Sequence, residues 1–243
     1  GATPDVVNDL SNKNRDGTIV TNRGSGVALE NQSFGFNRSD DSFIDIPDLP
    51  DSIDLSNGFT VDFEADFGSV DSWERILDIG NGSNSDNLVI SREGSSDHLA
   101  IQIFDGPASS DQSMIVFEDA IPSSETAQLK RYTLVADGST VDLYIDGVLF
   151  GGTKRIERGS QETMLRNINR TSNYVSRSNW RDDEGLGGYI RHIKFFNEPF
   201  GADLIDDLAV EYKDVTFENE AGNTSITTSG TLKLPDSGNV TGK

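Results

Sequence analysis

The sequence predicts an all-β protein, an antiparallel two-sheet jelly-roll β-sandwich with one short C-terminal helix. Residues 59–67 alternate between apolar and polar side chains, which is typical of a strand with one buried face and one wet, acidic face. Residues 132–152 form further alternating runs around Asp137-Gly138 and Asp146-Gly147. Asp-Gly between such runs is a strong hairpin signal, because type I′ turns need positive φ at both central residues.

Further strands are expected where short apolar runs lie between clusters of Gly, Asn, Asp and Ser. In chain order the predicted strands cover residues 17–21, 27–30, 43–46, 59–67, 74–79, 87–92, 98–104, 114–117, 130–136, 140–145, 148–150, 174–176 and 188–197. Apolar residues at near-helical spacing after Pro199 predict a short helix over residues 201–212, and residues 124–129 are predicted to form a single helical turn. Many short strands with few helices are typical of a sandwich or jelly roll.

The composition of the 243-residue chain changes after Lys213. We expect residues 1–213 to form the jelly-roll domain. Residues 214–243 are rich in Thr, Ser, Gly and Asn, which favours a linker, but β-branched residues alternate over 223–234. That second pattern predicts strands that begin, or pack with, a neighbouring Ig-like module, and both alternatives stay open. Gly1 in place of Met favours a piece excised from a longer protein.

Acidic side chains dominate the composition, with 41 Asp and Glu against 20 Lys and Arg and a formal net charge of −21. Such a charge repels nucleic acid and anionic membranes, so neither is an expected partner. No stretch reaches the roughly 18 apolar residues that membrane insertion requires. The absence of Cys excludes disulfides, thiolate metal sites and Cys nucleophiles. The acids either solvate the surface or, in a few clusters, bind a divalent cation.

Seven segments resemble the motifs of one family, in the same order along the chain. They are Leu10–Thr18 (LSNKNRDGT), Asp40–Ile46 (DDSFIDI), Phe59–Phe63 (FTVDF), Tyr132–Phe150, Tyr174–Trp180 (YVSRSNW), Gly188–Phe196 (GYIRHIKFF) and Ala202–Tyr212. Each motif alone is weak, and their shared order carries the resemblance. The chain resembles the laminin G-like domains of the concanavalin A-like lectin/glucanase superfamily, as found in bacterial surface adhesins. The resemblance implies their jelly-roll fold, and fold does not give function.

Calcium is the cofactor that the resemblance implies, because laminin G domains and pentraxins hold it in loops at the rim of the sandwich. Three loops are rich in oxygen donors, at residues 78–87, 105–111 and 179–184. The predicted calcium ligands are Asp86, Asn87, Asp105, Asp182 and Asp183, and ordinary polar turns are the alternative for each. A second possible metal site comprises Asp9, Asn12, Asn14 and Asp16. Arg191 stands where similar domains often carry an Asp ligand, which weakens this second site.

Trp180 lies in a polar, charged loop and is the main candidate for ligand binding. An exposed indole would stack on a sugar ring, and Asn84, Asn179 and Arg181 would orient hydroxyl groups or a carboxylate. Alternatively, Trp180 caps the core beneath its loop. Trp73 is predicted to pack at a strand edge.

Catalysis is not expected. Glucanases of this fold carry Glu-x-Asp followed by a second Glu, and retaining glycosidases need two carboxylates about 5 Å apart. The nearest match is Glu64-Ala-Asp66, where Gly68 and Ser69 stand at the positions of the second Glu. His98 and His192 are the only histidines, which argues against a Ser-His-Asp triad or a histidine zinc site.

The predicted function is therefore a non-catalytic, calcium-dependent module that binds a glycan, peptide or protein ligand on another cell surface. We expect it to act as a monomeric module of a large bacterial adhesin that is secreted or held at the cell surface. The alternatives are a structural spacer without a ligand and a glycoside hydrolase or lyase.

Overall fold

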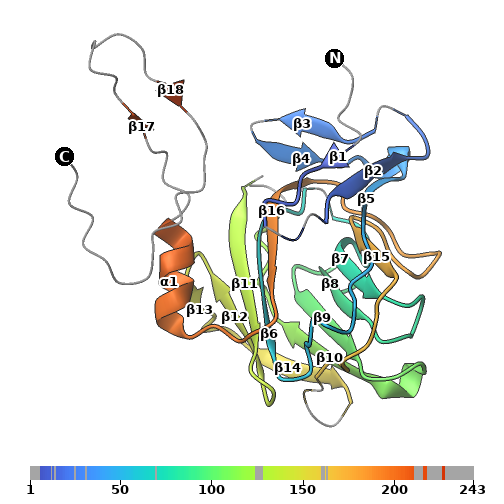
Figure 1. The fold of residues 1–243 in the computed structure, drawn as a ribbon, viewed down its shortest axis with the longest axis vertical. Helices are drawn as coiled ribbons and strands as arrows, with labels where there is room; N and C mark the ends of the chain where they lie inside the picture. The colour runs from blue at the N-terminus through green and yellow to red at the C-terminus, as the bar shows by residue number, and fades with distance from the viewer. Residues whose placement is uncertain are drawn as a thin grey trace. The chain divides into compact units, whose positions relative to one another are not determined.

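The computed structural model describes residues 6–210 except 12, 14, 25, 31, 69, 124–127, 160–161 and 163, and beyond them residues 216–217 and 226–227. The chain separates into two units, Gly1–Pro199 and Phe200–Lys243. The first unit contains two antiparallel sheets packed face to face (Figure 1). The second contains helix α1 (Ala202–Val210) and the paired strands β17 (Thr216–Phe217) and β18 (Ile226–Thr227). The all-β sandwich with one short C-terminal helix is confirmed.

Within the described residues, the larger sheet has nine strands and the smaller has seven. In sheet order, the larger consists of β1 (Val6–Val7), β2 (Gly17–Thr21), β5 (Ser42–Ile46), β15 (Ser172–Val175), β7 (Arg75–Gly80), β8 (Leu88–Arg92), β9 (Leu99–Phe104), β10 (Gln112–Phe117) and β14 (Lys154–Arg158). The smaller consists of β13 (Val148–Leu149), β12 (Val141–Ile145), β11 (Lys130–Ala136), β6 (Phe59–Asp66), β16 (Tyr189–Phe196), β4 (Ser33–Gly35) and β3 (Ala28–Glu30). Strands far apart in the sequence thus lie side by side, as β15 does between β5 and β7.

Each strand predicted in the sandwich is present, with ends shifted by at most two residues, and the predicted helix spans Ala202–Val210. Strands β1, β4 and β14 were not predicted. Strand β14 has no alternating apolar pattern, because Ile156 is its only apolar residue. It lies at the edge of the larger sheet, where charged side chains are typical. The helical turn expected at 124–129 lies mostly outside the described residues, as does most of the extension 214–243.

The core lies between the two sheets, and alternate residues of the central strands point into it, as Leu99, Ile101 and Ile103 of β9 do. Phe63 of β6 illustrates this, since it is fully buried and its ring stacks on Tyr132 of β11 with centroids 5.1 Å apart. The opposite face of β6 is less exposed to solvent than its alternation predicts. Asp62 is fully buried there and accepts hydrogen bonds of 2.7 Å from both Arg131 and Thr133. These donors, together with His192 at 3.0 Å, hold the pKa of Asp62 below its usual value although burial alone would raise it.

The two Asp-Gly turns differ in geometry. Asp146 and Gly147 both have positive φ, at 51° and 83°, between paired Ile145 and Val148, so this is the predicted type I′ turn. In the other hairpin only Gly138 has positive φ, at 93°, and Asp137 N donates to Thr140 O. The type I′ prediction is therefore wrong for Asp137-Gly138. Asp137 and Thr140 flank the turn, so Gly138 is its first central residue, the position at which a type II′ turn has positive φ.

Asp137 provides a direct test of this turn. Its Oδ1 accepts hydrogen bonds from the backbone N–H groups of Thr140 and Ser139, which lower the pKa of Asp137 from 3.8 to about 2. NMR titration of the carboxyl carbon is expected to give a midpoint near this value. Because the folded pKa lies below the unfolded one, this stabilisation is complete above about pH 4 and is lost as the pH falls toward about 2.

The Asp137→Asn variant supplies the control for that measurement. Asparagine keeps an acceptor for the turn but does not titrate, so this contribution to the acid dependence of unfolding is expected to disappear. A midpoint for Asp137 at the ordinary value of 3.8 would contradict the turn geometry.

Candidate functional site

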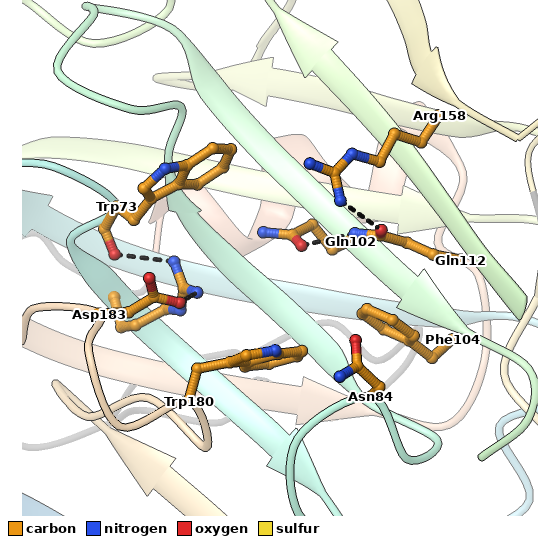
Figure 2. A pocket seen from close by; sticks show the side chains of 9 residues that line it. Trp73, Asn84, Gln102, Phe104, Gln112, Arg158, Trp180 and Asp183 are labelled. Carbon is orange, nitrogen blue, oxygen red and sulfur yellow. Dashed lines mark hydrogen bonds and ion pairs between the residues drawn. The ribbon is translucent and has the colours of Figure 1, made fainter. Parts of the chain in front are cut away.

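A pocket of about 210 Å³ opens on the face of the larger sheet that is turned away from the core (Figure 2). Its floor includes Gln102, Phe104 and Gln112, which alternate with core-facing residues along β9 and β10. Trp73 and Trp180 provide the walls, from loops that precede β7 and follow β15. The pocket therefore combines aromatic walls with a floor that carries amide groups.

The two tryptophans are half-buried and leave part of each ring for a ligand. Trp73 packs on a small apolar cluster that includes Met114 and Val116, on the outer face of β10. The Trp180 ring lies 5.6 Å from the Phe104 ring at an angle of 41°. Trp180 was predicted either to stack on a ligand or to cap the core. The indole covers the outer face of the larger sheet beside Phe104 and lines an open pocket.

Trp73 has a strained backbone, with φ at 60°. This left-handed conformation costs a side chain with a Cβ about 1–2 kcal/mol and is uncommon for a bulky residue. Trp73 N donates to Gly94 O at 3.0 Å, and Arg75 Nη1 donates to Trp73 O at 2.7 Å, which together hold the backbone in place. Asn84, which also lines the pocket, has φ at 57°. Residues with strained backbones are often found at functional sites. Here the two strained residues, Trp73 and Asn84, both line the same pocket.

A pair of variants at Trp73 tests the strain. Trp73→Ala and Trp73→Gly both remove the indole, but only Gly adopts positive φ without cost. We expect Trp73→Gly to be more stable than Trp73→Ala by about 1 kcal/mol in urea unfolding. The opposite order would show that residue 73 is not held in the left-handed region.

Charged groups occupy two sides of the pocket. Arg75 is 2% exposed and forms an ion pair with Asp183, while its Nε has no hydrogen-bond partner among the described residues. Burial lowers the pKa of Arg75, and the charges of Asp183 and Asp78 oppose this effect. Arg158 lies on the other side. Two arginines against one aspartate leave an excess of one positive charge in the lining, although the whole chain carries −21.

Asp78 of β7 holds together the two loops that supply Asn84 and Trp180. Its Oδ1 accepts hydrogen bonds from Asn87 Nδ2 at 2.9 Å and Asn179 Nδ2 at 2.8 Å, and its Oδ2 accepts one from Asn179 N at 2.7 Å. Asp78 is fully buried, and burial raises its pKa. Asn87 and Asn179 thus position the pocket loops through Asp78 and do not line the pocket.

The residues predicted to bind calcium are not brought together. Asp86 is buried and accepts a hydrogen bond of 2.7 Å from Arg166 Nε, Asp183 pairs with Arg75, and Asp105 and Asp182 are exposed. Within the described residues, no three Asp, Glu or His side chains lie close enough together to hold a metal ion. Calcium also accepts backbone carbonyl and amide oxygens, so calcium binding by these residues stays a prediction.

The second predicted metal site is described only in part, because Asn12 and Asn14 lie outside the described residues. Asp9 accepts hydrogen bonds from the backbone N–H groups of Ser11 and Arg15, and Asp16 accepts one from Asp9 N. Arg191 pairs with Glu64 at 3.0 Å.

Of the predicted ligand-binding residues, Trp180 and Asn84 line the pocket, whereas exposed Arg181 lies outside the lining. The sequence did not reveal the roles of Gln102, Gln112 and Arg158. A signal existed for Gln102, because a single amide between two isoleucines in an apolar strand marks an outward position.

The fold and the pocket define a lectin-like β-sandwich. A laminin G-like family model, described as the Concanavalin A-like lectin/glucanases superfamily, matches residues 38–206. The chain belongs to this superfamily. No curated protein matches the chain significantly. The described part of the chain contains no helix long and apolar enough to span a bilayer.

Solved structures of similar fold include binding domains of botulinum neurotoxins. The serotype G binding domain is 17% identical, with a TM-score of 0.52 over 85% of this chain and 50% of that one. A type C neurotoxin structure, whose description states that cell entry depends on interaction with two ganglioside molecules, is 13% identical with a TM-score of 0.57, over 87% and 52%. The DC binding domain in complex with rat synaptotagmin II is 14% identical with a TM-score of 0.54, over 87% and 52%. The chain thus spans about half the length of these structures, and they show its fold alone.

Proposed function

We propose that this domain is a non-catalytic glycan-binding module and that the pocket of Figure 2 is its binding site. The observation that carries the proposal is the pairing of Trp73 and Trp180 as walls above the Gln102 and Gln112 amides. Sugar rings have apolar faces that pack on aromatic rings and hydroxyl groups that bond to amides, and ligand pockets combine such surfaces with a few placed polar groups.

The carboxylates of the chain support binding without catalysis. Asp183 is the one carboxylate among the described lining residues, and it is ion-paired with Arg75. Glycoside hydrolysis requires a pair of carboxyl groups across the scissile bond. Glu64 and Asp66 lie on β6 of the other sheet, where Glu64 pairs with Arg191 and Asp66 accepts a hydrogen bond from Gly68 N.

We include in the proposal a wider role as a module of a larger secreted or cell-surface protein, such as an adhesin that contacts another cell. The lectin-like fold and the large negative charge support a solvated module of this kind. The same proposal includes a jelly-roll domain formed by residues 1–213, followed by residues 214–243 as a linker or as strands of a neighbouring Ig-like module.

Calcium dependence is a separate prediction, because Asp183 is the one predicted calcium ligand in the described lining of the pocket and it is ion-paired with Arg75. Calorimetric titration with calcium tests it, and saturable heat would support a cation site in the rim loops. The absence of such heat would leave a calcium-independent module.

A glycan and peptide array, probed once with calcium and once with a chelator, tests the function. We expect binding to at least one class of glycan and no requirement for calcium at the pocket. An array that stays blank in both conditions would contradict glycan binding and favour the structural spacer.

A further inference from the structure

Three hydrogen-bonded side chains form a chain along one side of the pocket (Figure 2). Arg158 Nη1 donates to Gln112 Oε1 at 3.0 Å, and Gln112 Nε2 donates to Gln102 Oε1 at 2.6 Å. A guanidinium group can only donate, so Gln112 must turn its oxygen toward Arg158 and its nitrogen toward Gln102. The arginine therefore sets the orientation of both amides.

The groups left over on this side are hydrogen-bond donors. Gln102 uses its oxygen to accept from Gln112, and its Nε2 has no acceptor among the described residues. In Figure 2 this amide lies between Trp73 and Trp180. Arg158 is exposed and commits one N–H to Gln112, so its other N–H groups remain for a ligand. A ligand that meets this side must supply acceptors.

Arg158 is also the charged side chain of the described lining that has no ion-pair partner among the described residues. No carboxylate of the described residues forms an ion pair with it, whereas Arg75 is balanced by Asp183. Arg155, three positions earlier on β14, shows the contrast, because it pairs with Glu93, Glu118 and Glu157. In a chain with a net charge of −21, an arginine without an acidic partner beside two indoles indicates an anionic ligand.

We propose that the pocket selects sugars that carry a carboxylate, which Arg158 holds while Trp73 and Trp180 pack on the ring. A carboxylate accepts two parallel hydrogen bonds from a guanidinium, and Gln102 Nε2 supplies a donor deeper in the pocket. The ligand class is an acidic sugar of the uronic or sialic type. This inference rests on the proposed glycan-binding function.

Calorimetry with matched probes tests the selection. The probes are digalacturonic acid with its dimethyl ester, sialyllactose with lactose, and sulfated lactose. We expect each carboxylate sugar to bind about tenfold more tightly than its neutral counterpart, since a charge-assisted hydrogen bond contributes that much or more. Arg158→Gln is expected to lower the affinity for the carboxylate sugars to that of their neutral counterparts, so that the preference is lost.

Arg181→Gln is the matched control, because it makes the same charge change at an exposed arginine outside the lining. It is expected to keep the preference intact. Arg158→Lys keeps the charge but not the planar fork, so it should recover only part of the preference. Thermal unfolding of each variant checks that the fold is retained.

Each other outcome overturns the inference in an identifiable way. Equal affinity for acid and ester, unchanged by Arg158→Gln, would overturn the selection and leave glycan binding standing. Sulfated lactose bound as tightly as sialyllactose would overturn the preference for carboxylate over other anions. No binding of any of these sugars, together with a blank array, would overturn both this inference and the proposed function.

Discussion

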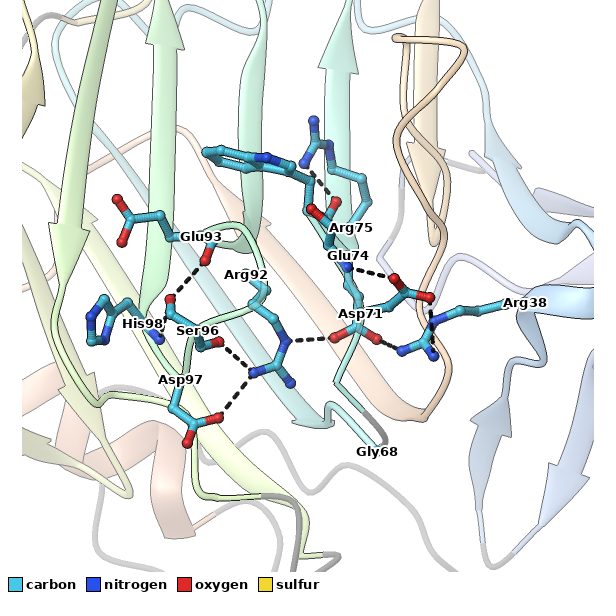
Figure 3. Close-up of polar contacts among 12 residues, drawn as sticks. Arg38, Gly68, Asp71, Glu74, Arg75, Arg92, Glu93, Ser96, Asp97 and His98 are labelled. Carbon is cyan, nitrogen blue, oxygen red and sulfur yellow. Dashed lines mark hydrogen bonds and ion pairs between the residues drawn. The ribbon is translucent and has the colours of Figure 1, made fainter.

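Replacing Glu74 with Gln is expected to lower the free energy of unfolding by about 3–5 kcal/mol. The Glu74 side chain is fully buried beside β7, where one oxygen accepts a hydrogen bond from Arg92 Nε at 2.6 Å and the other accepts one from Arg38 (Figure 3). Arg92 is 1% exposed, and its guanidinium carbon lies 5.5 Å from the centroid of the Phe67 ring. Glutamine keeps the shape of Glu74 but not its charge, so a buried cation loses its main counter-charge.

Urea unfolding at neutral pH measures this loss as a lower midpoint at an unchanged slope. Asp97→Asn is the matched control, because Asp97 also pairs with Arg92, at 3.1 Å, but its side chain is 36% exposed. Solvent screens that pair, so the control is expected to lose less than about 1 kcal/mol. Equal losses in the two variants would contradict a stabilising role for the buried pair.

Replacing Trp180 with Ala is expected to weaken glycan binding about 30-fold or more, because aromatic anchors of binding sites contribute about 2 kcal/mol or more. The indole forms one wall of the pocket, beside the Phe104 ring and with the Arg75 guanidinium carbon 5.7 Å from its centroid. Trp180→Phe keeps an apolar face and is expected to lose less affinity.

Calorimetry with the glycan that binds best on the array provides the measurement. Tyr189→Ala is the control, because Tyr189 is a 38% exposed aromatic residue on β16 of the other sheet. It should leave the affinity unchanged. A folded Trp180→Ala variant that binds as tightly as the wild type would place the ligand outside this pocket.

The strands could be predicted from local pattern, but the turns only in part. Strand β6 follows from its alternation, since successive side chains point to opposite faces whatever lies nearby. The Asp146-Gly147 turn is equally local. At Asp137-Gly138, however, the same dipeptide occupies a different position in the hairpin, because the Asp137 carboxylate caps two backbone N–H groups.

The candidate site could be predicted only where a residue was conspicuous by itself. Trp180 and Asn84 were found this way, because an indole and an amide in a polar loop stand out. Gln102 and Arg158 were not, since their meeting depends on β9, β10 and β14 lying side by side. The acids of the rim loops suggested calcium, yet Asp86 and Asp183 contact arginines that lie 80 and 108 residues away in sequence.

The pattern of apolar residues was enough to predict a β-sandwich and the core face of its strands, because strand geometry turns a spacing of two into a buried face. The order of seven motifs along the chain was enough to predict the family. Only the tertiary structure decided which acids are neutralised by arginines and which outward side chains share a pocket. The physical reason is that the order of strands in the sheet brings these partners together, and spacing along the chain does not encode that order locally.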